Sequence, residues 1–171
     1  AMYGLAEAER AQVFPQLLVE GNMADILKLI RCSHDGDRVA KFDQRGNQLR
    51  WDPGAFSSDE ALDRLLSILR NPSLTPEELE RSQLFWQPGG YERSIQQIDR
   101  MCDLVAHNLS DCGAAQLMGA GLGGDVEIAI RRDRIEDLRK LLLEHYYEPF
   151  GIHPEMTIIA TGEGACVLAR P

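Results

Sequence analysis

The 171-residue chain has no apolar run long enough to cross a membrane, and it has no excess of basic residues. A membrane-spanning helix needs about 20 consecutive apolar residues. With a formal net charge of −9, the chain lacks the positively charged surface that proteins use to bind the phosphate backbone of a nucleic acid. The N-terminus AMYGLAEAERAQ also lacks the basic and apolar regions of a signal peptide. We therefore expect no membrane partner and no nucleic-acid partner.

Cysteines are few and widely spaced, and no CxxC pair occurs. In a chain of this length, such cysteines indicate buried thiols of a cytoplasmic protein rather than a disulfide framework. Cys102, His107 and Cys112 do not have the tight spacing of structural zinc ligands. Asp35 and Asp37 resemble the start of a calcium loop, but the later oxygen ligands of such a loop are missing. We expect no metal site. No Ser/His/Asp arrangement and no carboxylate pair suggests hydrolysis, so we assign no catalytic residue.

Hydrophobic residues make up 44% of the chain and charged residues 26%, which is typical of one globular domain. Helical spacing of apolar residues predicts helices over Leu5–Val19, Met23–Cys32, Ser58–Arg70, Pro76–Phe85, Ser94–Leu109 and Arg134–Tyr147. Short apolar runs predict strands over Ala114–Met118, Val126–Ile130, Thr157–Ala160 and Ala165–Ala169. A β-hairpin is plausible from Val39–Asp43 and Asn47–Trp51.

The order of these elements predicts an α+β fold. From Ser94 onward it reads helix, strand, strand, helix, strand, strand. With one earlier strand from Val39–Trp51, this order gives a ferredoxin-like two-layer sandwich, in which helices cover one face of an antiparallel sheet. Residues 1–171 then form a single domain with added helices, and residues 39–90 are an elaborated or inserted segment with apolar faces of its own.

Several side chains are given local roles by their position. Ser57 with Glu60, and Thr75 with Glu78, predict capping boxes, and Asp133 predicts a helix cap. Pro15 should kink or restart the first helix. The polar residues Ser33–Arg38 are expected to follow the second helix as a turn. Helical periodicity puts three charged residues on solvent-facing sides and one histidine near an inner face: Arg10, Asp99, Asp103 and His145.

A glycine-rich stretch joins two of the predicted strands, with the sequence Gly119-Ala120-Gly121-Leu122-Gly123-Gly124-Asp125. Four glycines in six residues are costly in conformational entropy unless the backbone needs positive φ or close approach by a ligand. A turn without bulky side chains lets backbone N–H groups face an anion, usually phosphate. The alternative is a tight hairpin with no ligand.

The segment Leu117–Gly124, preceded by Cys112–Ala115, resembles the third motif of the GHMP kinases, and within them the galactokinase-like sugar kinases. Glu9-Arg10, Leu17-Leu18, Gly21-Asn22 and Ser33-His34 resemble that group's helix pair and serine–histidine. Ser94, Ile98-Asp99 and Leu104–Ala106 resemble the helix before the motif, and Gly164–Leu168 resembles the closing strand. The resemblance covers Leu5–Arg38 and Ser94–Arg170 and leaves the middle unmatched.

This resemblance implies the C-terminal domain of a two-part kinase. The family's ATP-cradling loop and catalytic aspartate lie in an N-terminal half, and no Gly-x-x-Ser-Ser-Ala stretch occurs here. We therefore expect ATP and Mg²⁺ in the complete kinase, no tightly bound cofactor in this chain alone, and no activity of the isolated chain. The implied partners are the N-terminal half and a small-molecule sugar. A severed half should also expose an apolar face around Gly119–Gly124, where a second copy can associate in a homodimer.

The resemblance also implies roles for single residues. Gly119, Ala120, Gly121, Gly123 and Gly124 would lie beside the nucleotide phosphates. Asp125 departs from galactokinases and resembles phosphomevalonate kinases better; we expect it to cap or orient the turn. Ser33 and His34 are candidates on the substrate side. The alternative for His34 is a structural role as a cap of the second helix, which is the commoner role of a lone histidine after a helix. The alternative functions are a non-catalytic ligand-binding or dimerisation domain and half of a phosphomevalonate-kinase-like enzyme.

Overall fold

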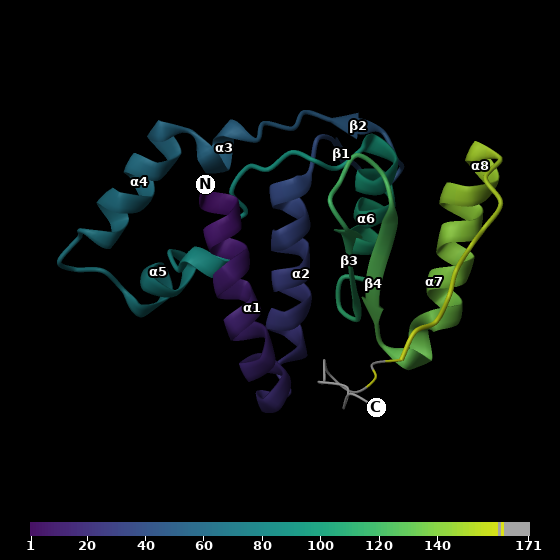
Figure 1. Ribbon diagram of the computed structural model, residues 1–171, viewed down its shortest axis with the longest axis horizontal. Coiled ribbons are helices and arrows are strands. Elements are labelled where there is room, and N and C mark those ends of the chain that lie inside the picture. Colours follow the sequence, from purple (N-terminus) through teal and green to yellow (C-terminus); the bar gives the residue numbers. More distant parts are fainter. Residues whose placement is uncertain (161, 163–171) are drawn as a thin grey trace, which may run out of the picture.

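Two long helices open the chain and pack side by side (Figure 1). The computed structural model describes residues 1–160 and 162. Helix α1 spans Met2–Glu20 without restarting at Pro15, and α2 spans Met23–Asp37. Gly21 ends α1 with a left-handed φ of 70°, the conformation that favours glycine after a helix. The predicted helix pair and its turn are confirmed.

Helix α2 continues five residues beyond its predicted end at Cys32, so the expected turn after it is wrong. The Asp-Gly sequence that suggested a turn lies inside the helix. A Cβ at Gly36 would fall 2.2 Å from the Pro88 carbonyl oxygen and 2.6 Å from the Tyr3 ring. This glycine therefore serves close packing between α2, α1 and the segment around Pro88.

Residues 39–90 form a hairpin followed by small helices along one end of the molecule (Figure 1). Strands β1 (Lys41–Phe42) and β2 (Gln48–Leu49) pair antiparallel. They are followed by α3 (Gly54–Ser57), α4 (Asp59–Leu69), α5 (Pro76–Arg81) and the 3₁₀ turn η1 (Leu84–Trp86). The Thr75–Glu78 capping box is confirmed. The other predicted cap is displaced by one residue, because Ser57 belongs to α3 and Ser58 caps α4.

The second half contains the larger hairpin and its supporting helices. Helix α6 spans Gln96–Asn108, β3 spans Gly113–Met118 and β4 spans Asp125–Ile130. The two strands pair antiparallel from Gly113↔Ile130 to Met118↔Asp125. The 3₁₀ turn η2 (Arg132–Arg134), α7 (Ile135–Leu142), the π-helical turn η3 (Leu143–Tyr147) and α8 (Glu148–Phe150) follow.

Two predictions about this last helical region are wrong. Asp133 does not cap a helix; it lies in η2 and its carboxylate pairs with Arg131 at 2.6 Å. His145 is exposed, whereas Tyr146 and Tyr147 are buried. The π-helical turn accounts for this change, since its wider spiral shifts which residues face inward.

The sheet is smaller than predicted. In residues 1–160, β1–β2 and β3–β4 are separate two-stranded sheets, so the first hairpin adds no strand to the second. Thr157–Ala160 is not a strand, and the predicted strand Ala165–Ala169 lies outside the described residues. The α+β class is confirmed, while the ferredoxin-like sandwich stays a prediction.

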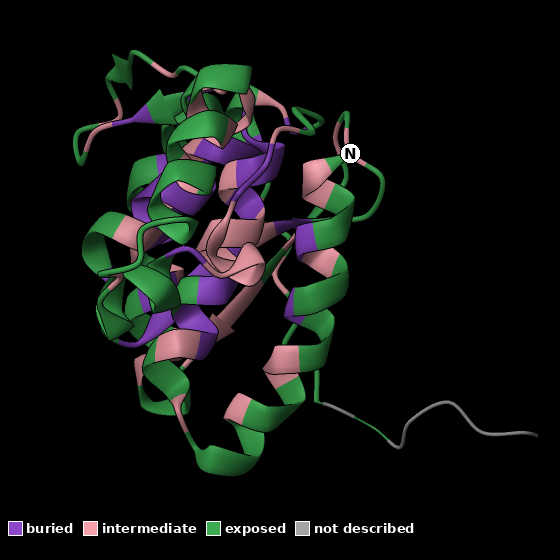
Figure 2. Cartoon of the chain, turned by 90° about the vertical axis from the view of Figure 1, so that its left-hand side faces the viewer, coloured by how far each residue is buried: buried purple, intermediate pink, exposed green. Residues whose placement is uncertain are grey.

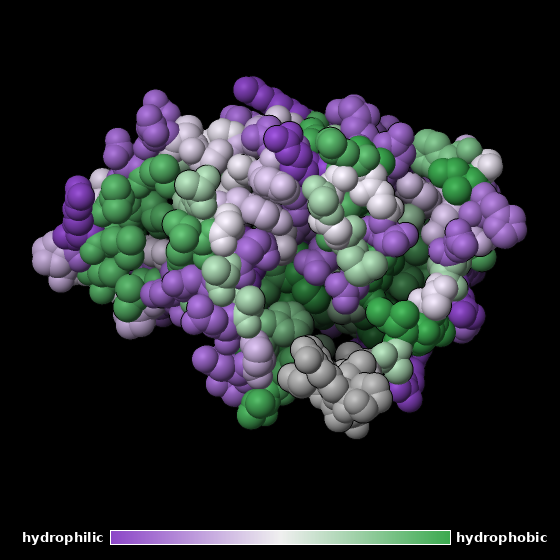
Figure 3. Space-filling view, viewed as in Figure 1, coloured by the Kyte–Doolittle hydropathy of each residue, from purple (hydrophilic) through white to green (hydrophobic). Residues whose placement is uncertain are grey.

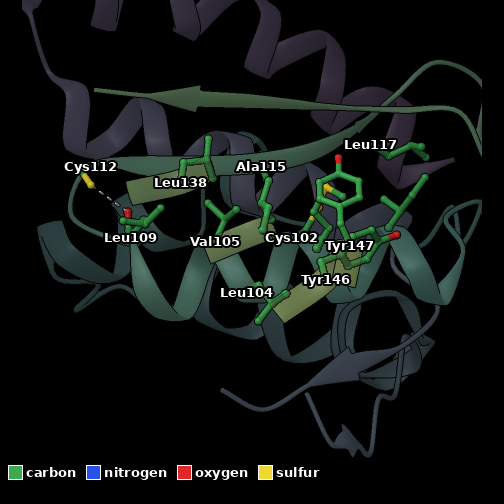
Figure 4. Packing of buried hydrophobic residues seen from close by; sticks show 13 residues of the cluster. Cys102, Leu104, Val105, Leu109, Cys112, Ala115, Leu117, Leu138, Tyr146 and Tyr147 are labelled. Carbon is green, nitrogen blue, oxygen red and sulfur yellow. Dashed lines mark hydrogen bonds between the residues drawn. The ribbon is translucent and has the colours of Figure 1, made fainter. Parts of the chain in front are cut away.

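The hydrophobic core lies between α6, α7 and one face of the β3–β4 hairpin (Figure 4). Val105 on α6 is fully buried, and Leu142 on α7 is 1% exposed. Ala115 and Leu117 on β3 face the same cluster, beside their partners Ile128 and Val126 on β4. Burial is concentrated in these inner elements, whereas α1 carries only Ala6 and Arg10 as buried residues (Figure 2). This core holds the hairpin and its glycine-rich turn in place.

Candidate functional site

The glycine-rich turn Gly119–Gly124 joins β3 to β4 in a largely left-handed backbone. All four glycines have positive φ, and so does Leu122, at 62°. Apart from Leu122, no residue of the turn donates its backbone N–H to another described residue. Added Cβ atoms at Gly119 and Gly123 would meet nothing within 4 Å. Within the described residues, the turn is therefore open and presents backbone donors without an acceptor.

One side of the turn rests on the backbone of Arg93. The Leu122 N–H donates to the Arg93 carbonyl at 2.5 Å. A Cβ at Gly121, where φ is 93°, would fall 2.4 Å from that same oxygen. Glycine at this position is thus required both by the backbone conformation and by the close contact.

The segment that carries Arg93 is itself fixed to the end of α2. The Tyr91 N–H donates to the Gly36 carbonyl at 2.8 Å, and the Ser94 N–H donates to the Asp37 carbonyl at 2.9 Å. The exposed Arg93 guanidinium lies 5.7 Å from the centre of the Tyr91 ring. The Arg93 side chain therefore starts against the turn, since its Cβ lies 2.5 Å from the position that a Cβ on Gly121 would occupy. Sequence analysis did not single out Arg93, because only the long-range contact between residues 93 and 122 connects it with the turn.

His34 supports the other side of the turn from inside the protein. Its side chain is 1% exposed, and Nδ1 accepts a hydrogen bond from the Leu117 N–H at 3.4 Å, two residues before the turn begins. That bond leaves the proton on Nε2, which faces Asp99 Oδ1 at 3.2 Å. His34 thus links α2, α6 and β3, and it positions the strand that enters the turn.

Asp99 and Asp103 are buried on α6, which corrects their predicted place on its solvent side. Asp99 Oδ2 accepts from the N–H groups of Val39 and Ala40 at 3.0 and 2.7 Å. Asp103 Oδ2 accepts from the Phe42 N–H and from the Arg38 guanidinium, each at 2.7 Å. Buried carboxylates are stable only when paired in this way.

These contacts also affect protonation. Burial alone would raise the pKa of Asp99, but the neighbouring polar groups of His34 and Ser94 and the backbone N–H of Val39 outweigh it and hold that pKa below its usual value. The network therefore favours the ionised carboxylate behind the turn.

Arg10 is likewise buried, contrary to its predicted place on the polar side of the first helix. Its guanidinium donates to the carbonyl oxygens of Phe85 and Gln87 at 2.9 and 3.0 Å. Glu7 pairs with it at 2.6 Å. Arg10 thus fixes the returning end of segment 39–90 to α1.

The structure separates the other predicted site residues. Ser33 lies beside His34 in sequence, but it is near Tyr3 of α1 rather than near the turn. Asp125 is exposed and directly follows the turn. Its carboxylate accepts no hydrogen bond from residues 1–160, so the expected local cap is not formed there. The phosphate-contacting role of Gly119, Ala120, Gly121, Gly123, Gly124 and Asp125, and the substrate-side role of Ser33 and His34, stay predictions.

The surroundings of the turn are partly apolar. Leu122 is 77% exposed and Met118 is 47% exposed. Within residues 1–160, no group of three or more His, Cys, Asp or Glu side chains is placed to hold a metal ion. No described helix combines the length and apolar character needed to cross a membrane.

Comparison with curated proteins gives matches to galactokinases. The chain is 28% identical over 78 residues to a galactokinase of Glaesserella parasuis, and 24% identical over 78 residues to one of Haemophilus influenzae. Each match covers 46% of this chain and 20% of the relative's length. No family model and no solved structure matches the chain. The chain is therefore similar, over less than half its length, to a fifth of the galactokinase chain.

Proposed function

We propose that this chain is the C-terminal, GHMP-kinase-like part of a galactokinase-like sugar kinase, which transfers the γ-phosphoryl group of ATP to a sugar hydroxyl. The observation that carries the proposal is the open glycine turn, whose backbone N–H groups other than that of Leu122 have no acceptor in the part of the chain that the structure describes. It occurs in a chain with partial similarity to galactokinases. The ferredoxin-like sandwich belongs to the same proposal.

The residues of the turn fit a polyphosphate. Successive backbone N–H groups in a turn can form an anion-binding concavity, and the absence of side chains at Gly119 and Gly123 leaves room for a close approach. The Arg93 side chain starts against Gly121, and in this proposal its guanidinium turns toward the bound phosphates. Arginine is well suited to phosphate oxygens because its planar group offers paired donors.

ATP and Mg²⁺ are the implied cofactors of the complete kinase. When bound, ATP supplies the phosphoryl group and Mg²⁺ offsets its negative charge. Gly119–Gly124 and Arg93 would hold the phosphates, while His34 keeps the entering strand in place from within. Phosphoryl transfer depends mainly on positioning and charge stabilisation, which is what these residues provide. The exposed carboxylate of Asp125 would repel phosphate unless a cation lies between them.

The test uses the full polypeptide encoded around this segment, assayed for ADP release from Mg-ATP with galactose and other aldoses. We expect sugar-dependent ADP release. Gly121→Val should lower kcat/KM by roughly 100-fold, as expected for the loss of positioned donors. Gly4→Ala is the matched control, since a Cβ there meets nothing within 4 Å, and it should leave kcat/KM unchanged.

Two outcomes would contradict parts of this proposal. ADP release without any dependence on a sugar, or none at all from a folded full polypeptide, would overturn the sugar kinase assignment and favour a non-catalytic ligand-binding domain. ATP turnover by the purified 171-residue chain would overturn its proposed inactivity in isolation.

A further inference from the structure

Helix α4 has an apolar stripe that the described part of the chain covers only in part, since Leu62 and Leu65 are half-buried. Four leucines recur at helical spacing on one face: Leu62, Leu65, Leu66 and Leu69. None of the helix's residues is buried, and Leu66 and Leu69 are 43% and 42% exposed. The principal contact of α4 is with the short helix α3. Figure 3 shows a hydrophobic patch over the end of the molecule that α4 and α5 form.

The charges beside this stripe are arranged in a self-complementary way. At about 100° per residue, Asp59, Asp63 and Arg70 fall on the same flank of the leucine stripe. The acidic residues occupy the first part of the helix and Arg70 follows its last residue. In an antiparallel helix pair with two-fold symmetry, the same flanks of the two helices face each other. The acidic start of each helix would then meet Arg70 of the other.

We propose that α4 is the interface between two copies of this chain, which associate through an antiparallel α4–α4 pair. Leu62 of one copy would pack near Leu69 of the second copy, and Leu65 near Leu66. In a parallel pair this flank would face the opposite flank of the second helix, so the pairing of Asp59 and Asp63 with Arg70 would be lost. This inference rests on α4 alone and goes beyond the proposed kinase function, so either can fail without the other.

Sedimentation equilibrium of the full 171-residue chain tests the proposal, over a concentration range of about 1 to 300 μM that covers ordinary dimer affinities. We expect a monomer–dimer equilibrium. Leu66→Asp should raise the dissociation constant at least about tenfold, because it puts a charge at the centre of the apolar contact. The matched control is Leu79→Asp on α5, a leucine of similar exposure at 46%, which should leave the constant unchanged.

A charge exchange tests the antiparallel orientation. Arg70→Asp should weaken the dimer by about two- to fivefold, as expected for exposed ion pairs. Combining it with Asp59→Arg should restore wild-type affinity. Circular dichroism checks that each variant keeps its helices. A wild-type chain that stays monomeric over the whole concentration range would overturn the proposal. It would do so even if another protein were found to bind α4. So would a Leu66→Asp variant that dimerises normally, or a double variant that remains as weak as Arg70→Asp.

Discussion

Two parts of the molecule have similar sequence patterns: the hairpin unit, which is the β3–β4 hairpin with helices α6 and α7, and the α4–α5 segment. They differ in how far their apolar and charged side chains are buried and in how distant their hydrogen-bond partners are. Both have leucine stripes, but Leu142 on α7 is 1% exposed whereas Leu69 on α4 is 42% exposed. Both carry charges, but Asp99 and Asp103 of α6 are buried and accept hydrogen bonds from backbone N–H groups far away in sequence. The caps of α4 and α5 are local, three residues apart.

This difference indicates which part of the molecule supports the glycine turn. The turn is fixed through His34, Asp99 and the Arg93 carbonyl, all of which connect elements far apart in sequence. Helices α4 and α5 contribute no buried residue. Stability should therefore be concentrated in the hairpin unit, and segment 59–81 should unfold locally at lower free-energy cost.

The largest effect is expected from breaking the buried ion pair. Asp103→Ala should lower the free energy of unfolding by about 3–5 kcal/mol, because it removes the acceptor of the buried Phe42 N–H and one of the two carboxylates that pair with the buried Arg38 guanidinium. Urea denaturation measures the change. Asp63→Ala on α4 is the control, and should change stability by less than about 0.5 kcal/mol. Equal losses of unfolding free energy in the two variants would mean that a charged side chain contributes as much to stability on α4 as on α6.

The next effect compares two leucines directly. Leu142→Ala should lower the free energy of unfolding by about 2–5 kcal/mol, since it leaves a cavity in the core. Leu69→Ala should lower the free energy of unfolding by less than about 0.5 kcal/mol, since the Leu69 side chain is already partly in water. Both are measured by thermal and urea unfolding at low protein concentration, where the proposed dimer does not contribute. A loss above 2 kcal/mol for Leu69→Ala would show that α4 packs more tightly than described.

A smaller effect concerns acid stability. The pKa of Asp99 is lower in the folded chain than in the unfolded one, so its contribution is present above the unfolded value of about 3.9 and is lost as the pH falls through the folded value. Asp99→Asn should lower stability at neutral pH and make it fall less steeply below pH 4 to 5. Asp63→Asn should keep the wild-type slope. An unchanged slope in Asp99→Asn would contradict the assignment of that pKa shift.

The smallest effect is expected at the helix caps. Ser58→Ala should reduce the local stability of α4 by about 1 kcal/mol, because the Ala61 N–H loses its acceptor. Amide hydrogen exchange should then quicken in α4 while α6 stays unchanged. Parallel loss of protection in α6 would show that α4 and the core unfold together.

Sequence patterns predicted the elements whose partners are near in sequence or follow a simple period. The β3–β4 hairpin, the helix pair and the Thr75–Glu78 cap belong to this class. Hydrophobic periodicity could not place Asp99, Asp103 and Arg10, because these charged residues are buried by contacts with backbone groups at least 59 residues away. The same holds for Gly36, whose role depends on Pro88, and for Arg93, whose link to the turn is a single long-range hydrogen bond.

The most direct test of the account is a titration of the ¹⁵N-labelled chain with Mg-ATP, followed by amide chemical shifts. We predict saturable shifts of the amides of Gly119–Gly124 and residues next to Arg93, with weak affinity. These shifts should be lost in Gly121→Val and retained in Gly4→Ala. Saturable shifts confined to another part of the chain, or none at millimolar Mg-ATP, would contradict the claim that this turn receives phosphate.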